Sequence, residues 1–213
     1  MMLKKTFLKF YLFILPFSAC QKNESSVPPR DVQVQTIEDN EALVTYLQTH
    51  FYNYHDFEND PDNHKIEISL DSLTDKNSDK IALWDQVVTK FVDTEDSDQN
   101  IVEHKLYYLI VKKGLGSMPS SVDSTFVSYK GSLLNGDVFD DRDYPIWFDL
   151  VNVVRGFRES LPEFNEGNFT INEDGTFNFD NYGKGLIFMP SALGYYSSAN
   201  SNIPAYSPLI FSV

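Results

Sequence analysis

The sequence predicts an α+β fold in which a bent, half-barrel antiparallel sheet wraps around one short helix. Two observations lead to this prediction. From residue 101 onward, short segments rich in branched and aromatic residues follow one another, as β-strands do. Only one stretch among them, residues 152–160, suits a short helix. We expect a helix-containing region over residues 36–100 to precede this sheet.

Composition narrows the class of protein further. The chain has 213 residues, and its 31 Asp and Glu against 17 Lys and Arg give a formal net charge of −14. This balance argues against a nucleic acid partner, because phosphate binding needs clustered positive charge. A single Cys excludes an internal disulfide and a zinc site built from several cysteines. The 17 Phe and 12 Tyr supply ample material for a core.

The first 19 residues have the features of a secretory signal. Lys4, Lys5 and Lys9 precede a short apolar run over residues 10–17, which is too short to span a bilayer. The segment Phe17-Ser18-Ala19-Cys20 resembles a bacterial lipobox. That resemblance implies cleavage before Cys20 and acylation of this residue, with residues 20–35 as a polar tether.

The lipobox reading sets an expected location. The protein would be anchored by lipid in a bacterial cell envelope, at the outer membrane, with the side of that membrane left open. The alternative is an ordinary signal peptide with Cys20 lost or free.

The region 36–100 is predicted in outline. Asp39 or Asn40 can cap a helix that runs to about Phe51, whose apolar residues recur every four positions. The alternation at residues 66–70 suits a half-buried strand. Residues 84–91 suit either a short helix or an irregular strand, and the acidic segment 93–100 a loop.

Strands are expected over most of the remaining chain. The turn before one of them is predicted at Glu173-Asp174-Gly175, a favourable hairpin sequence. The predicted strands cover residues 102–111, 125–130, 138–140, 169–171, 176–179, 186–189 and 209–213.

Five short motifs in this half resemble one known family. They read VSYKG at 127–131, NGDVFD at 135–140, PIWF with VVRGF within 145–157, GLIFMPSALGY at 185–195, and IP with LIF within 203–211. In this order they resemble the FK506-binding-protein (FKBP) type of peptidyl-prolyl cis-trans isomerase. The resemblance covers residues 101–213 and implies an isomerase domain there.

The resemblance also implies a site. Asp140 would lie near the twisting carbonyl and bond to Tyr129, while the Tyr195 hydroxyl and the Ile203 backbone N–H would bond to substrate carbonyls. The implied catalytic residues are Tyr129, Phe139, Asp140 and Tyr195, and the implied substrate-binding residues are Phe148, Val153, Val154, Phe157, Ile203 and Phe211.

These residue types suit the reaction. Rotation about a peptide bond must break its resonance, at a barrier of about 18–20 kcal/mol. The twisted amide has a less polar carbonyl, so a dry pocket favours it over the planar amide. The assignment requires a hollow between the rings that admits a pyrrolidine. Proline-containing polypeptides are the expected partners, with a macrolide of FK506 type as an inhibitor.

Neither a cofactor nor a metal is expected. The acidic segment 56–67 imitates calcium-loop spacing, but Pro61 stands where such a loop needs Gly.

Departures from the family pattern leave two alternatives open. Phe157 stands where Trp is frequent, and Ile146 replaces a common aromatic residue. Tyr196 replaces a Gly, so we expect that loop to turn differently and partly cover the site. One alternative is therefore a binding module that holds proline-containing segments without turnover. The other is a structural envelope lipoprotein, with gliding among its candidate roles, in which residues 36–100 carry the main function.

Overall fold

The computed structural model of the chain describes residues 28–59 and 66–213. The predicted signal peptide, Cys20 and the first part of the tether lie outside these residues. The helices are α1 (Val32–Thr49), α2 (Tyr54–Asn59) and α3 (Arg155–Ser160), with 3₁₀ turns η1 (Leu83–Asp85), η2 (Leu150–Asn152), η3 (Leu161–Phe164) and η4 (Ser191–Leu193). The strands are β1 (His50–Tyr52), β2 (Leu70–Ser72), β3 (Val88–Glu95), β4 (Ile101–Lys112), β5 (Ser124–Leu133), β6 (Val138–Asp149), β7 (Asn168–Ile171), β8 (Phe177–Asp180), β9 (Lys184–Met189) and β10 (Leu209–Ser212).

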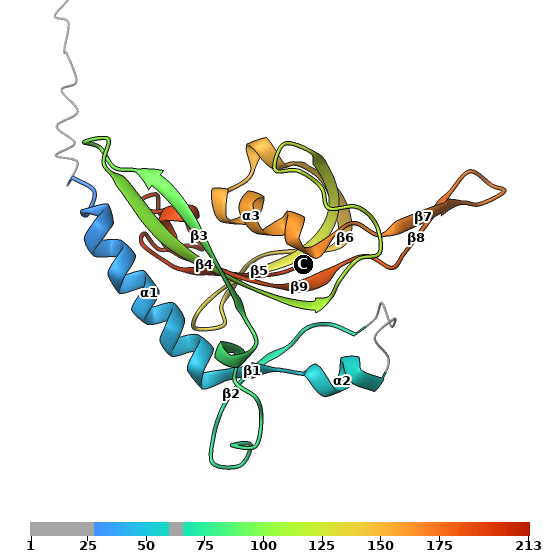
Figure 1. The fold of residues 1–213 in the computed structure, drawn as a ribbon, viewed down its shortest axis with the longest axis horizontal. Helices are drawn as coiled ribbons and strands as arrows, with labels where there is room; N and C mark the ends of the chain where they lie inside the picture. The colour runs from blue at the N-terminus through green and yellow to red at the C-terminus, as the bar shows by residue number, and fades with distance from the viewer. Residues whose placement is uncertain (1–27, 60–65) are drawn as a thin grey trace, which may run out of the picture.

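One six-stranded sheet organises the molecule. Its strand order is β3-β4-β9-β10-β5-β6, and all neighbours are antiparallel. The sheet curves around α3 on one face, and α1 crosses its other face (Figure 1). The predicted α+β fold with a bent antiparallel sheet around one short helix is therefore confirmed.

The central strands are buried on both faces. Along β4, Leu106 and Tyr108 belong to the core beneath α3, whereas Tyr107 and Leu109 belong to the core beneath α1. Side chains of a strand alternate between the two faces of its sheet, so both faces need apolar residues. This requirement explains why β4 reads as a continuous apolar run from Leu106 to Val111.

Helix α1 begins earlier than the sequence suggested. The Asp31 carboxylate caps it by accepting hydrogen bonds from the backbone N–H groups of Gln33 at 2.8 Å and Val34 at 3.2 Å. The prediction of a cap at Asp39 or Asn40 is wrong, because Asp39 lies buried in the middle of the helix. Residues 32–35, which the sequence assigned to the tether, are helical.

The segment between α1 and β4 also differs from its prediction. The strand expected over 66–70 is reduced to β2, which pairs with β1. The acidic loop expected over 93–100 is shorter, because β3 continues to Glu95 and pairs along its length with β4. Strand β3 thus joins residues before position 101 to the main sheet, and the division of the chain at that position stays a prediction.

The C-terminal half follows the sequence closely. The single helix falls at α3, and each predicted strand is present. The turn at 173–175 is the tip of the β7–β8 hairpin, where Gly175 has a φ of +82° and its N–H donates to the Asn172 carbonyl. Among the described residues, no helix has the length and apolar character needed to cross a membrane.

Candidate active site

The curved face of the sheet brings the predicted site residues together beneath α3. Strands β5 and β6 supply Tyr129, Phe139, Asp140 and Phe148, and β10 supplies Phe211. Val153 and Val154 precede α3, and Phe157 lies within it. Tyr195 and Ile203 come from the loop between η4 and β10. The residues thus come from five parts of the chain, and only the fold gathers them.

Phe157 is the centre of an aromatic cluster, which consists of Tyr129, Phe139, Phe148, Phe157 and Phe211. Its ring centroid lies 5.3 Å from that of Phe211, 5.9 Å from that of Phe148 and 6.1 Å from that of Tyr129, each in edge-to-face contact. Such contacts add about 0.5–1.5 kcal/mol per pair beyond simple burial. Phe157 and Phe211 are buried, whereas the other three rings keep part of their surface open.

Gly131 makes room for this cluster. A Cβ atom at this position would lie 2.5 Å from the Phe139 ring and 3.0 Å from the Phe211 ring. The absence of a side chain on β5 thus allows the Phe139 ring to reach Phe211, where the two rings stand edge to face at 5.6 Å.

A polar pair borders the rings. The Tyr129 hydroxyl donates a hydrogen bond to Asp140 Oδ2, and the backbone N–H of Asp141 donates to Oδ1 at 3.0 Å. Arg142 Nε lies 3.7 Å from the same Oδ1. Burial, together with the hydrogen bond and charge of Asp140, raises the pKa of Tyr129 to about 12. The hydroxyl therefore stays protonated and acts as a donor at every physiological pH.

Tyr195 and Ile203 differ in exposure and in whether their hydrogen-bond donor already has a partner within the protein. The Tyr195 side chain is 40% exposed, and burial together with the Asp140 carboxylate raises the pKa of its hydroxyl. The charge of Asp140 therefore reaches this hydroxyl. The Ile203 side chain is buried, but its backbone N–H donates to the Asn200 Oδ1 at 2.8 Å. The donor that the resemblance assigns to a substrate carbonyl thus already has an internal acceptor.

Tyr196 does not cover the site as the sequence suggested. Its φ is +48°, which lies in the left-handed region that Gly adopts without cost. Tyr196 thus has the backbone conformation that a Gly at this position would have. Its ring stands edge to face on Tyr206 at 5.2 Å, and its hydroxyl donates to the Arg30 carbonyl. The Tyr196 side chain therefore packs on Tyr206 and bonds to the segment before α1.

Helix α1 holds the start of the same loop through a buried carboxylate. Asp39 is 2% exposed, and its Oδ2 accepts from the Ser191 backbone N–H at 2.8 Å and from the Ser191 hydroxyl at 2.6 Å. Gln35 donates to Oδ1 at 2.8 Å. Burial is the main cause of a raised Asp39 pKa, although these hydrogen bonds oppose it. Through Ser191, α1 fixes the turn that leads to Tyr195.

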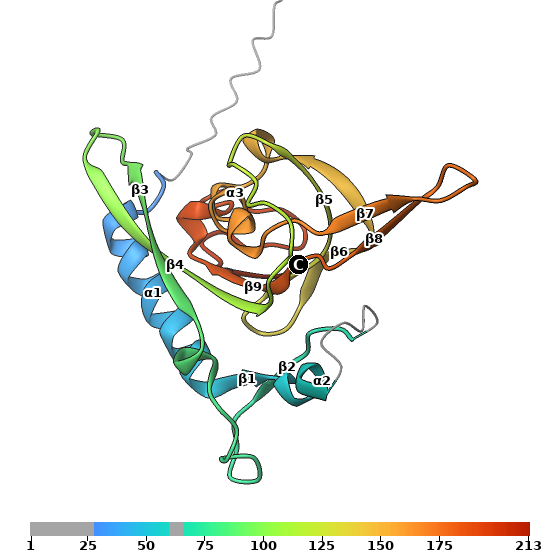
Figure 2. The same ribbon diagram turned by 45° about the vertical axis from the view of Figure 1, so that its right-hand side comes forward.

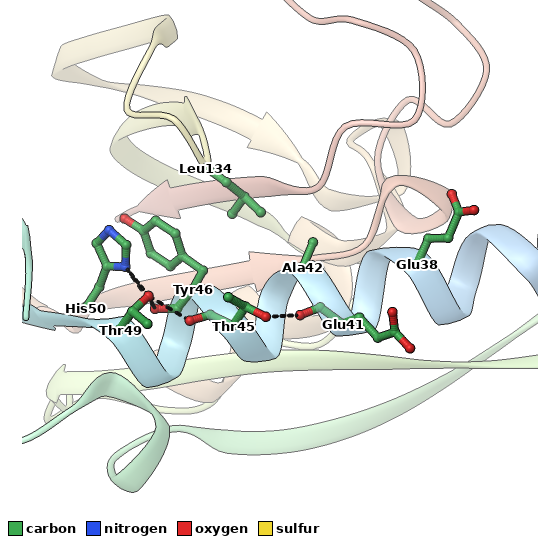
Figure 3. A pocket seen from close by; sticks show the side chains of 8 residues that line it. All are labelled: Glu38, Glu41, Ala42, Thr45, Tyr46, Thr49, His50 and Leu134. Carbon is green, nitrogen blue, oxygen red and sulfur yellow. Dashed lines mark hydrogen bonds between the residues drawn. The ribbon is translucent and has the colours of Figure 1, made fainter.

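Two surface hollows on the described part of the chain stand apart from the aromatic cluster. One, of about 510 Å³, lies along α1 below Leu134, and its rim carries Glu38 and Glu41 (Figure 3). The other, of about 440 Å³, lies beside β3 and includes Arg155. Neither contains a residue of the cluster, whose rings are in mutual contact. Neither hollow is therefore the space between the rings that the sequence interpretation requires.

Sequence reasoning missed four residues that shape this site. Arg142 is two positions from Asp140 on β6, so its charge could have been noticed. Asn200 has the spacing of a side chain that caps its own turn, with bonds from the N–H groups of Asn202 and Ile203. Asp39 and Ser191 are 152 positions apart. No local pattern could have paired them.

Comparison with known proteins extends these observations. Residues 116–213 match the family model described as FKBP-type peptidyl-prolyl cis-trans isomerase. The chain is 32% identical over 111 residues to the FKBP-type peptidyl-prolyl cis-trans isomerase FkpA of Escherichia coli strain K12, which is 51% of this chain and 36% of that protein. It is 31% identical over 130 residues to the peptidyl-prolyl cis-trans isomerase Mip of Chlamydia muridarum, which is 58% of this chain and 46% of that protein.

The crystal structure of FkpA from Escherichia coli is 28% identical, with a TM-score of 0.42, over 56% of this chain and 48% of that chain. This chain thus spans about half or less of the length of each of these relatives.

Proposed function

From the premise that this chain belongs, through residues 116–213, to the FKBP-type peptidyl-prolyl cis-trans isomerases, we propose that it accelerates X-Pro rotation in polypeptides. The observation that carries the proposal is the aromatic cluster, which presents ring faces and edges beside the Tyr129–Asp140 pair. Proline-containing segments of envelope or secreted proteins are the proposed substrates.

The cluster would act by favouring the twisted amide. The pyrrolidine ring would rest on the open surfaces of Tyr129, Phe139 and Phe148, above the buried floor of Phe157 and Phe211. A twisted amide loses conjugation and needs less solvation of its carbonyl than a planar one. An apolar surface therefore binds the transition state better than the ground state, which lowers the barrier without a covalent step.

The polar groups would orient the substrate. Tyr195 is 40% exposed, and its hydroxyl would donate to a substrate carbonyl. The Ile203 N–H can do so only after it leaves the Asn200 side chain. Asp140 would lie near the twisting carbonyl, held by Tyr129 and by the Asp141 N–H. No proton is transferred, so Asp140 has an electrostatic role.

A protease-coupled assay tests the proposal. A peptide with an Ala-Leu-Pro-Phe sequence is cleaved only in its trans form, so the rate of cleavage reports isomerisation. We expect purified, folded protein to accelerate the slow phase in proportion to its concentration, and a macrolide of FK506 type to abolish this. A slow phase that folded protein leaves unchanged would refute the activity.

Two observations favour a second candidate, a module that binds proline-containing segments without turnover. The rings lie in contact with one another, and the Ile203 N–H is already bonded. Such a module would shift the amide resonances of a proline peptide in solution without accelerating its isomerisation. Measurement of binding and rate on one sample separates the two candidates.

We also propose that acylation of Cys20 anchors the protein in the bacterial envelope, at the outer membrane. The support is the lipobox-like segment 17–20 with its preceding basic and apolar residues. Substitution Cys20→Ser should move the protein from the membrane fraction to the soluble fraction. If this variant still sediments with membranes in the absence of detergent, the anchor is not at Cys20.

A further inference from the structure

The β7–β8 hairpin has one apolar face that is open to solvent. The cross-strand pairs Phe169–Phe179 and Ile171–Phe177 share this face, because alternate residues of paired strands point the same way. These four side chains are between 42% and 65% exposed. The hairpin projects from the body of the molecule in both views (Figures 1 and 2).

The apolar face continues onto the main sheet. The Phe126 ring lies 5.3 Å from Phe179 on the hairpin and 5.2 Å from Trp147 on β6. Trp147 is 68% exposed and Phe126 37%. These six residues, Phe126, Trp147, Phe169, Ile171, Phe177 and Phe179, form what we call the hairpin surface.

Strand β6 links the hairpin surface to the candidate active site. Trp147 belongs to the hairpin surface, and the next residue, Phe148, contacts Tyr129 and Phe157 in the aromatic cluster. Strand β6 is one of the two edge strands of the main sheet. An extended polypeptide that crosses this edge could therefore touch both places within a few residues, at about 3.3 Å per residue.

The area of the surface suits a polypeptide segment better than a second copy of the chain. A fully exposed aromatic side chain offers about 200 Å², so the six residues expose on the order of 600 Å². This lies at the upper end of the roughly 300–600 Å² of the largest apolar patch on a typical monomer, a patch that is often functional, and falls short of the roughly 800 Å² per partner of a stable dimer. A net charge of −14 on each copy also opposes self-association.

The charge around the hairpin indicates the chemistry of the occupant. Residues 165–183 contain Glu166, Glu173, Asp174 and Asp180 and have no Lys or Arg. An anionic lipid surface would be repelled by this arrangement. A segment that combines aromatic or branched residues with Lys or Arg would satisfy both the apolar face and its acidic surroundings.

We propose that the hairpin surface is an accessory binding site for extended polypeptide segments that alternate aromatic or branched residues with basic ones, on the same chain as the proline delivered to the aromatic cluster. Only the delivery of a proline to the aromatic cluster rests on the proposed isomerase function. Direct binding to the hairpin surface stands independently of turnover.

Two fluorescent peptides test the proposal. The first has the Ala-Leu-Pro-Phe core alone, and the second extends this core with alternating Phe, Lys, Leu and Lys residues. We expect the extended peptide to have a KM on the order of tenfold lower. The double substitution Phe169→Thr and Phe177→Thr should remove this advantage and leave the rate on the short peptide unchanged.

Matched controls separate the hairpin face from the fold of the hairpin. Thr170→Ser on the opposite face should preserve the advantage of the extended peptide. Trp147→Thr, which lies on β6 outside the hairpin, should remove part of it. An extension with Glu in place of Lys should bind no better than the short peptide. Equal KM values for the extended peptide with wild type and the double variant would overturn the proposal.

Other occupants give different results. Sedimentation of the wild type as a dimer that the double variant disperses would overturn the proposal in favour of a second copy. Binding to vesicles of phosphatidylglycerol that the double variant loses would overturn it in favour of a membrane. If neither peptide is isomerised, the proposed function fails. Anisotropy with the extension alone, without proline, then still decides whether the hairpin surface binds.

Discussion

The aromatic cluster and the hairpin surface are built from the same kinds of residue but have opposite relations to water. In the aromatic cluster, Phe157 is 4% and Phe211 5% exposed, with α3 packed over the curved sheet. On the hairpin, Phe169 and Phe177 are 58% and 55% exposed although their rings also touch, at 5.7 Å. Ring contact alone therefore does not bury an aromatic residue.

The difference lies in the covering element. Gly131 leaves room for the rings of the cluster to pack edge to face around Phe157 of α3, whereas the hairpin is a separate two-stranded sheet whose apolar side chains stay 42–65% exposed. A two-stranded ribbon cannot bury a face by itself. The cluster therefore contributes to stability as well as to the proposed chemistry, whereas the exposed hairpin side chains contribute little to stability.

The largest expected effect is a difference in unfolding free energy between a variant in the aromatic cluster and one in the hairpin. Phe157→Ala removes a buried ring that touches three others and should cost about 3–5 kcal/mol of unfolding free energy. Its isomerase rate should fall at least about tenfold. Phe177→Ala in the hairpin should cost no more than about 0.5 kcal/mol, because its ring is exposed. Urea unfolding of both variants measures the comparison.

Similar losses for the two variants would contradict this division. A costly Phe177→Ala would mean that the hairpin face is covered in solution, and the concentration dependence of unfolding would then identify self-association.

The effect of the hydrogen bond between Tyr129 and Asp140 can be measured separately from the effect of ring packing. Tyr129→Phe keeps the ring contacts and removes only the hydroxyl that bonds Asp140. We expect a loss of about 1 kcal/mol, which corresponds to roughly fivefold in kcat/KM, with the ring packing intact. An activity equal to wild type would show that Asp140 needs no orientation by Tyr129.

The stability that the buried Asp39 of α1 contributes through its bonds to Ser191 should depend on pH. Burial raises the pKa of Asp39 in the folded state, so the folded protein binds a proton more tightly there than the unfolded chain does. The stability contributed by Asp39 is thus full below its unfolded pKa of 3.8 and declines as pH rises through the folded pKa. Asp39→Asn lacks this decline.

The unfolding free energy of wild type minus that of Asp39→Asn should therefore decrease as the pH rises from about 4 to 7. Chemical denaturation at a series of pH values measures it. A difference that increases with pH would mean that the bonds from Ser191 outweigh the burial.

The smallest expected effect is the response of activity to pH. The Tyr129 pKa of about 12 keeps its hydroxyl protonated, and no step of the proposed mechanism transfers a proton. We expect kcat/KM to be constant between pH 6 and pH 9. A bell-shaped profile in this range would indicate a titrating catalytic group and refute the mechanism.

The sequence predicted the parts of the fold that local pattern controls. The strands after residue 101 follow from their branched and aromatic residues. The turn follows from Gly175, because Gly readily adopts the positive φ found there. The start of α1 was misplaced because Asp31, Asp39 and Asn40 are all plausible caps, and the sequence does not reveal which of them is buried.

The predicted site was incomplete for a different reason. The ten predicted residues lie on β5, β6 and β10, in or just before α3, and on the loop that leads to β10, but the partners that orient them are set by tertiary contact. Asn200 takes the Ile203 N–H, and Asp39 reaches Ser191 from the opposite layer of the molecule. Such pairs depend on how the layers stack, which neither periodicity nor motif spacing records.

The decisive measurement is the isomerisation rate of the Ala-Leu-Pro-Phe peptide with wild type, Phe157→Ala and Phe177→Ala, each checked for folding by circular dichroism. The aromatic cluster as the site of catalysis requires wild type and Phe177→Ala to accelerate the reaction equally, and Phe157→Ala to lose most of this acceleration while still folded. Full acceleration by folded Phe157→Ala would place catalysis elsewhere.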